Sequence, residues 1–174
     1  MLPSGHIGAA YLVYALFRRL ADWPTPDRLT LGAIIVGGLF ADLVDKPLAW
    51  ELGVLAAGRS LAHSLLTASV VIAVVMLVAS KYDRLQPAIA FSLGHLSHIV
   101  TDGYTPLLQD GSTDFILWPL GPYQIWDGGL WVPPQYATEL NWGVLAVAVG
   151  LWIYEGLPGL RSSSETNPAA SGES

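Results

Sequence analysis

One stretch decides how the chain can fold: GHLSHIVTD, residues Gly94–Asp102. It places two imidazoles and a carboxylate in a segment that is otherwise apolar. At 3.6 residues per turn, the spacing of His95, His98 and Asp102 puts all three on one face of a helix. Neutral imidazole and ionised carboxylate are ligands for divalent metal ions. The stretch therefore predicts an apolar helix that carries a metal site in or beside a membrane.

The composition of the whole chain favours an integral membrane protein. Of its 174 residues, 52% are hydrophobic and 13% are charged, and the mean hydropathy is +0.47. Soluble domains carry about 25% charged residues. The net charge is -6 and no basic patch is visible, which argues against nucleic acid as a partner. Because the chain has no cysteine, a bound metal would need His, Asp or Glu ligands.

Five apolar segments predict an all-α, polytopic membrane helix bundle. They cover about residues 7–17, 29–44, 61–79, 87–100 and 140–154. Only the third approaches the length of about 20 residues that a spanning helix normally needs. The shorter segments can be accommodated if their polar ends face a cavity lined by protein rather than lipid. We expect residues 1–160 to form one membrane-embedded domain and residues 161–174 to form a disordered tail.

The region between the fourth and fifth segments, residues 104–139, differs from the rest because it is rich in Pro, Gly, Trp and Tyr. Proline at this density is expected to preclude a long helix. Trp and Tyr favour the membrane interface, so we interpret the region as an outer loop that forms a lid at the headgroup level. An interfacial anchor without a catalytic part is an equal alternative.

The distribution of Lys and Arg predicts an orientation in the membrane. Two basic residues, Lys46 and Arg59, remain outside when the other six are placed in the cytoplasm: Arg18, Arg19, Arg28, Lys81, Arg84 and Arg161. The positive-inside rule then favours five spans in the inner (plasma) membrane with the N-terminus outside. This orientation gathers the unusual polar residues near the extracytoplasmic side: His6, Asp42, Asp45, Arg59, His63, His95, His98 and Asp102.

The second segment ends with two carboxylates, Asp42 and Asp45, at positions i and i+3. Asp42 is a candidate metal ligand. Asp45 is a candidate ligand, a partner that orients a ligand histidine, or a general base. The alternative is solvation of a helix end, with Lys46 paired to one of the two carboxylates. His6, near the N-terminus, is a further candidate ligand.

Arg59 and His63 are spaced i and i+4, so we expect them on one helix face at the start of the third segment. His63 is a candidate ligand. Arg59 beside a metal would bind a phosphate or carboxylate substrate through two parallel hydrogen bonds, and its alternative role is an interfacial anchor. For His95 and His98, the alternative is a pair of buried, hydrogen-bonded histidines. That alternative is weaker in a membrane segment, where ionisable groups are costly.

Taken in order, these motifs resemble the YdjM/YbcI family of small membrane proteins, which are described as membrane-bound metal-dependent hydrolases. The resemblance covers roughly residues 5–120 and rests on His6, Asp42-x-x-Asp45-x-Pro47, Arg59-x-x-x-His63-Ser64, Gly94–Asp102 and Trp118-Pro119. The family usually has Pro-Asp-x-Asp in its second motif, whereas this chain lacks the proline and has one more residue between the acids. A more distant similarity connects the order His6, Asp42, His63, His98, Asp102 with zinc-dependent phospholipase C and P1 nuclease.

These observations predict a metal-dependent hydrolase in which an activated water attacks an ester or phosphoester, with a lipid as the substrate suggested by the location. One or two divalent ions, with zinc as the first choice, would be bound by His63, His98, Asp102 and Asp42, followed by His6 and His95. Asp45 is the candidate base and Arg59 the candidate substrate anchor. The alternative is a non-enzymatic membrane protein that binds or transports a metal ion or a proton.

Overall fold

The computed structural model describes residues 1–109, 114–120 and 134–160. In this part of the chain there are five α-helices and no strand, so the all-α prediction is confirmed. The helices are α1 (Pro3–Leu20), α2 (Arg28–Lys46), α3 (Leu65–Lys81), α4 (Leu85–Gln109) and α5 (Pro134–Tyr154). A π-helical turn, Pro47–Glu51, extends α2, and a 3-10 helix, Asp114–Leu117, follows α4. The predicted tail, residues 161–174, lies outside the described residues.

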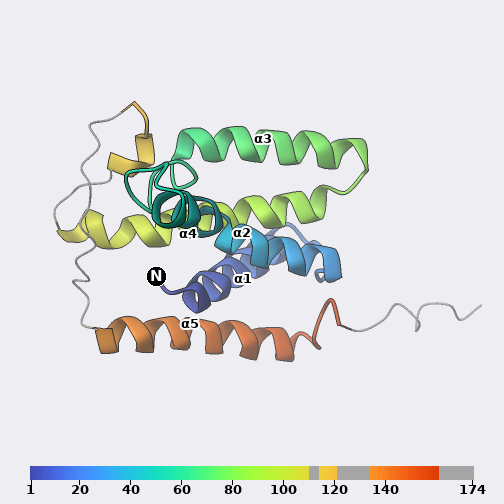
Figure 1. Ribbon diagram of the computed structural model, residues 1–174. Helices are drawn as coiled ribbons and strands as arrows, with labels where there is room; N and C mark the ends of the chain where they lie inside the picture. Colours follow the sequence, from blue (N-terminus) through green and yellow to red (C-terminus); the bar gives the residue numbers. More distant parts are fainter. Residues whose placement is uncertain (110–113, 121–133, 161–174) are drawn as a thin grey trace, which may run out of the picture.

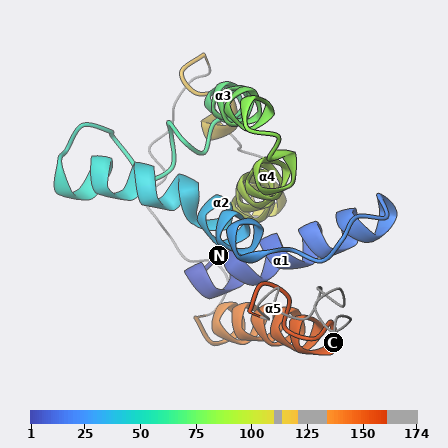
Figure 2. The same cartoon turned by 90° about the vertical axis from the view of Figure 1, so that its right-hand side faces the viewer.

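The helices pack in a layered bundle (Figure 1), in which α3 lies on α4, and α1 and α2 lie between α4 and α5. The most extensive contact joins α2 to α4, and α1 touches α2, α4 and α5. A view turned by 90° (Figure 2) shows the far end of α2 running out of the bundle into the π-helical turn and the loop before α3. Within the described residues, none of the helices combines the length and the apolarity expected of a membrane span.

The start of the third helix differs from the prediction. Residues 52–64 form an irregular loop of bends and turns, and α3 begins at Leu65, with the side chain of Ser64 accepting a hydrogen bond from Leu66 N at 3.2 Å. The prediction that Arg59 and His63 share a helix face is therefore wrong. The reason is a long-range one, because the backbone of this loop is hydrogen-bonded to a carboxylate on α2.

The end of the fourth helix also differs from the prediction. α4 runs through Pro106 to Gln109, although a long helix was not expected after residue 104. Pro106 lies in the last turn, where the missing N–H removes only one hydrogen bond close to the helix end. Much of the proposed lid lies outside the described residues, namely 110–113 and 121–133.

Glycines allow α2 and α4 to touch through their backbones. A Cβ atom at Gly37 would lie 2.3 Å from Phe91 O, and one at Gly94 would lie 2.9 Å from Ile34 O. No larger residue fits these positions without moving a helix. The close approach brings the backbone carbonyl of Gly38 within reach of the side chains of α4, which matters for the site described below.

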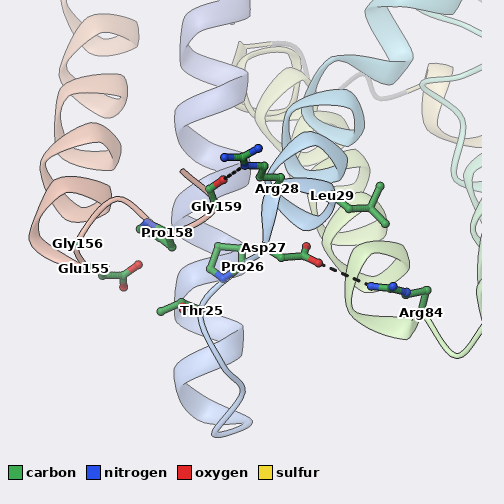
Figure 3. Close-up of a pocket in the computed structure, with 10 residues that line it drawn as sticks. All are labelled: Thr25, Pro26, Asp27, Arg28, Leu29, Arg84, Glu155, Gly156, Pro158 and Gly159. Carbon is green, nitrogen blue, oxygen red and sulfur yellow. Dashed lines mark hydrogen bonds and ion pairs between the residues drawn. The ribbon is translucent and has the colours of Figure 1, made fainter. Parts of the chain in front are cut away.

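The end of the bundle where α2 begins and α5 ends is rich in charged residues (Figure 3). Arg28 donates a hydrogen bond to Gly159 O at 3.1 Å, and Arg84 lies 3.9 Å from Asp27. Together with Glu155, these residues line an open pocket of about 850 Å³ between the start of α2 and the end of α5. This end contains Arg28 and Arg84, two of the residues that were predicted to face the cytoplasm.

Candidate metal centre

Four buried side chains from three separate segments converge on one point. They are Asp42 on α2, His63 just before α3, and His98 and Asp102 on α4. One ligand atom of each lies within 4.8 Å of all the others. His63 Nε2 is 3.1 Å from His98 Nε2 and 3.5 Å from Asp102 Oδ2. We call these four residues the metal group.

The hydrogen bonds of His63 and His98 determine which ring nitrogen of each carries a hydrogen, and so which nitrogen can bind a cation. His98 Nδ1 lies 2.7 Å from Gly38 O, and because a carbonyl can only accept, this nitrogen carries the hydrogen. His63 Nδ1 likewise lies 2.8 Å from the carboxylate oxygen Asp45 Oδ2. In the neutral rings both Nε2 atoms then present lone pairs to each other at 3.1 Å. This contact is favourable only when a cation, either a proton or a metal ion, lies between them.

Asp42 gives a second sign that a cation fits the metal group. Its Oδ1 is buried without a hydrogen-bond partner among the described residues. The same oxygen lies 3.6 Å from His63 Nε2 and 3.7 Å from His98 Nε2. Zinc ligands at about 2.0–2.2 Å in a tetrahedron are about 3.3–3.6 Å apart. The donor types and their separations therefore fit a divalent ion.

Asp45 is a fully buried carboxylate beside the metal group. It accepts hydrogen bonds from the backbone N–H groups of Ser60 and Ala62, each at 2.8 Å, and from His63 Nδ1. Because both of its oxygens are occupied, Asp45 holds the loop before α3 and fixes the ring of His63. These bonds explain why the loop is not helical.

The pKa of His63 responds to this environment. Burial alone would lower it, but hydrogen bonds to Asp102 and Asp45 outweigh burial and hold the pKa above its usual value. Without a metal, a proton on His63 is therefore the cation that satisfies the facing nitrogen atoms and the nearby carboxylates.

His6 and His95, the other two predicted ligands, lie beside the metal group. His6 Nε2 is 3.2 Å from Asp102 Oδ1, and its ring stacks on His98 with centroids 3.8 Å apart. His95 points elsewhere, since its Nε2 donates to Ala62 O at 2.8 Å. The structure therefore brings four of the six predicted ligands together, leaving His6 in contact with two of them, Asp102 and His98, and His95 in contact with the loop.

Two partly exposed side chains with a positive charge, Arg59 and Lys46, contact carboxylates of the metal group, and the N-terminal ammonium group of Met1 lies 2.5 Å from Asp102 Oδ1. Arg59 Nε donates to Asp102 Oδ2 at 2.8 Å, and Lys46 Nζ donates to Asp42 Oδ2 at 2.5 Å. Their side chains are 25% and 32% exposed, against at most 8% for the four members of the metal group. The sequence analysis considered Lys46 only as a partner of a surface carboxylate. The spacing of four residues between Asp42 and Lys46 could have predicted that Lys46 lies at the site, because residues four apart share a helix face.

Part of the Trp- and Pro-rich region packs beside His63. Ser64 Oγ donates to Trp118 O at 2.7 Å, and the ring of Phe115 lies edge-on to His63 with centroids 6.2 Å apart. Residues 114–120 thus cover one side of the site. Whether the whole region acts as a lid stays a prediction.

The chain was compared with known protein families, curated proteins and solved structures. A sequence model of the YdjM inner membrane protein family matches residues 1–162. The chain belongs to this family. No curated protein and no solved structure gives a significant match. The predicted resemblance to the YdjM family is thereby confirmed, and the family is described as one of inner membrane proteins. The similarity to hydrolases, including zinc-dependent phospholipase C and P1 nuclease, stays a prediction.

Proposed function

We propose that this YdjM-family protein is a membrane-bound metal-dependent hydrolase. The observation that carries the proposal is the pair of ring nitrogens, His63 Nε2 and His98 Nε2, that face each other beside two buried carboxylates. Nitrogen and oxygen ligands without thiolate suit zinc, which is the ion we propose. When bound, a divalent ion lowers the pKa of a water molecule and polarises the bond to be cleaved.

The neighbouring residues have supporting roles in this proposal. Asp45 fixes the ring orientation of His63 rather than acting as the base, because its oxygens already accept hydrogen bonds. His6 orients Asp102, and His95 anchors the loop through Ala62 O. Arg59 is the substrate anchor, because it lies on the exposed side of the metal group.

We further propose that the protein crosses the inner membrane several times, with the metal group near the extracytoplasmic side. Two features support this placement. The metal group lies where α2 ends and α3 begins, whereas Arg18, Arg28 and Lys81 lie at the other ends of α1, α2 and α3. Large apolar side chains on α3 and α5 are exposed, as expected for surfaces in contact with lipid: Val70, Val74, Leu77, Val147 and Ile153. A site at the headgroup level favours a lipid or another phosphoester as substrate.

Hydrolysis of a model phosphodiester by the zinc-loaded protein tests the proposal. Asp42→Asn keeps the shape of the side chain but removes the charge of a ligand. We expect it to lower kcat/KM for bis(p-nitrophenyl) phosphate by about a hundredfold or more, since several kcal/mol of charge stabilisation are lost. An equally active Asp42→Asn variant would contradict the proposal. A wild-type protein that moves zinc into proteoliposomes without hydrolysing the ester would favour the transport alternative.

A further inference from the structure

Lys46 and Arg59, the two partly exposed cationic side chains at the metal group, contact the carboxylates that would bind the ion. Lys46 Nζ donates to Asp42 Oδ2, while Oδ1 of the same carboxylate faces the two histidines. Arg59 contacts Asp102 Oδ2, which itself faces His63 Nε2. Each cation is therefore separated from the position of the ion by a single carboxylate group, and it lies on the side of that carboxylate that faces solvent.

The balance of charge at the metal group changes when an ion binds. Among the described residues, three carboxylates, Asp42, Asp45 and Asp102, stand against the side chains of Lys46 and Arg59 and the N-terminal ammonium group of Met1, which lies 2.5 Å from Asp102 Oδ1. A divalent ion that replaces the proton on His63 raises the net charge of this group by one. Because the carboxylates then also neutralise the ion, an anionic substrate at Lys46 and Arg59 is favoured over a neutral ester.

The position of Lys46 is defined by more than one contact. Its ammonium group lies 5.8 Å from the centre of the Trp50 ring, and its stem passes the backbone at Gly58, where an added Cβ would be 3.5 Å from Lys46 Cγ. These contacts arise because the π-helical turn continues α2 and carries Trp50 four residues after Lys46, and the loop that follows brings Gly58 back beside both side chains. Lys46 is thus held at the entrance to the site rather than extended freely into solvent.

We propose that Lys46 and Arg59 form an anion-binding clamp that takes the phosphate group of the substrate, with Lys46 as a specificity-determining residue. The proposal rests on the proposed function, and it restricts the substrate to phosphate esters. The phosphate group can belong to a lipid headgroup or to a soluble ester, because both present the same oxygens to the clamp.

Binding of inorganic phosphate to the zinc-loaded, full-length protein in detergent tests the clamp by calorimetry. Lys46→Met removes the charge but keeps the apolar stem against Trp50. Lys81→Met is a matched control, because Lys81 is also the last residue of a helix but lies at the opposite end of the bundle. We expect Lys46→Met and Arg59→Gln to weaken phosphate binding by roughly tenfold to a hundredfold. Arg59→Lys should retain part of the affinity, and Lys81→Met should bind as the wild type does.

Zinc content, measured in the same samples, separates this proposal from the proposed function. Zinc in the wild type and in Lys46→Met, with unchanged phosphate affinity in the variant, would overturn the clamp but leave the metal site intact. A wild-type protein without zinc would overturn both. Nanodiscs with and without phosphatidic acid identify the source of the phosphate group. If phosphatidic acid competes with inorganic phosphate, the clamp takes a lipid headgroup; if it does not compete, the clamp takes a soluble ester. Failure of both inorganic phosphate and phosphatidic acid to bind would contradict the clamp.

Discussion

At the scale of single residues, the site depends on how hydrogen bonds orient each ligand. The backbone carbonyl of Gly38 fixes His98, and the carboxylate of Asp45 fixes His63, so that both rings direct Nε2 to the same point. The His98–Asp102 pair was predictable, because residues four apart on a helix share a face. For Asp45 the sequence left three roles open, the orienting role among them, because its partners lie in a loop without a periodic pattern.

Asp45→Asn tests whether this residue orients a ligand rather than binding the metal or a proton. The amide keeps the size of the side chain but weakens its hold on His63 Nδ1. We expect zinc affinity to fall by about tenfold to a hundredfold, as for other partners of ligand histidines, and not to vanish. Competition with a zinc-binding dye measures the affinity. A variant with wild-type affinity would argue against the orienting role.

The raised pKa of His63 predicts how stability depends on pH. In metal-free protein the proton on His63 stabilises the fold below its unfolded pKa of about 6.5, and this contribution is lost as pH rises through the higher pKa of the folded state. Zinc must displace the same proton, so its stabilising effect should grow as pH rises.

Thermal unfolding with zinc and with a chelator, from about pH 5 to about pH 9, measures this dependence on pH. We expect the Tm difference between the two conditions to increase with pH in the wild type. His63→Gln, which cannot be protonated in this range, should reduce that dependence. A difference in Tm that shrinks as pH rises would be inconsistent with the account.

At the scale of helices, the contact between α2 and α4 builds the site. Glycines at the contact let Gly38 O reach His98, and the same contact places Asp42 beside Asp102. A glycine-rich second segment was visible in the sequence, but its partner helix was not, since periodicity identifies a face without identifying what covers it.

Gly94→Ala tests this helix contact. The added Cβ would lie 2.9 Å from Gly38 N, so α4 must shift away from α2. We expect a loss of about 1–3 kcal/mol in the free energy of unfolding, together with weaker zinc binding. Gly32→Ala is the control, because nothing lies within 4 Å of its added Cβ, and it should be neutral or slightly stabilising. Equal stabilities of the two variants would refute the argument.

At the scale of the whole molecule, the two ends of the bundle differ in chemistry. The metal group lies at one end, and the arginines near the start of α2 and the end of α5 lie at the other. Lys and Arg positions alone predicted that the polar residues gather, and four of the six predicted ligands do converge. The irregular loop and the extension of α4 were missed, because tertiary hydrogen bonds and packing determine them.

Cysteine labelling tests the proposed orientation, since the native chain has no cysteine. Leu52→Cys lies in the exposed loop near the metal group, and Asp83→Cys lies in the turn between α3 and α4. A membrane-impermeant maleimide added to intact spheroplasts should label position 52 and should reach position 83 only after permeabilisation. The reverse pattern would place the metal group on the cytoplasmic side.

Metal analysis of the purified protein tests the central claim most directly. The wild type, loaded with zinc and dialysed, should retain roughly one or more equivalents, because two histidines and two carboxylates are oriented to bind it. The double variant His98→Ala/Asp102→Ala should retain none, while far-ultraviolet circular dichroism shows that it remains helical. A helical double variant that retains as much zinc as the wild type would contradict the assignment of the metal group.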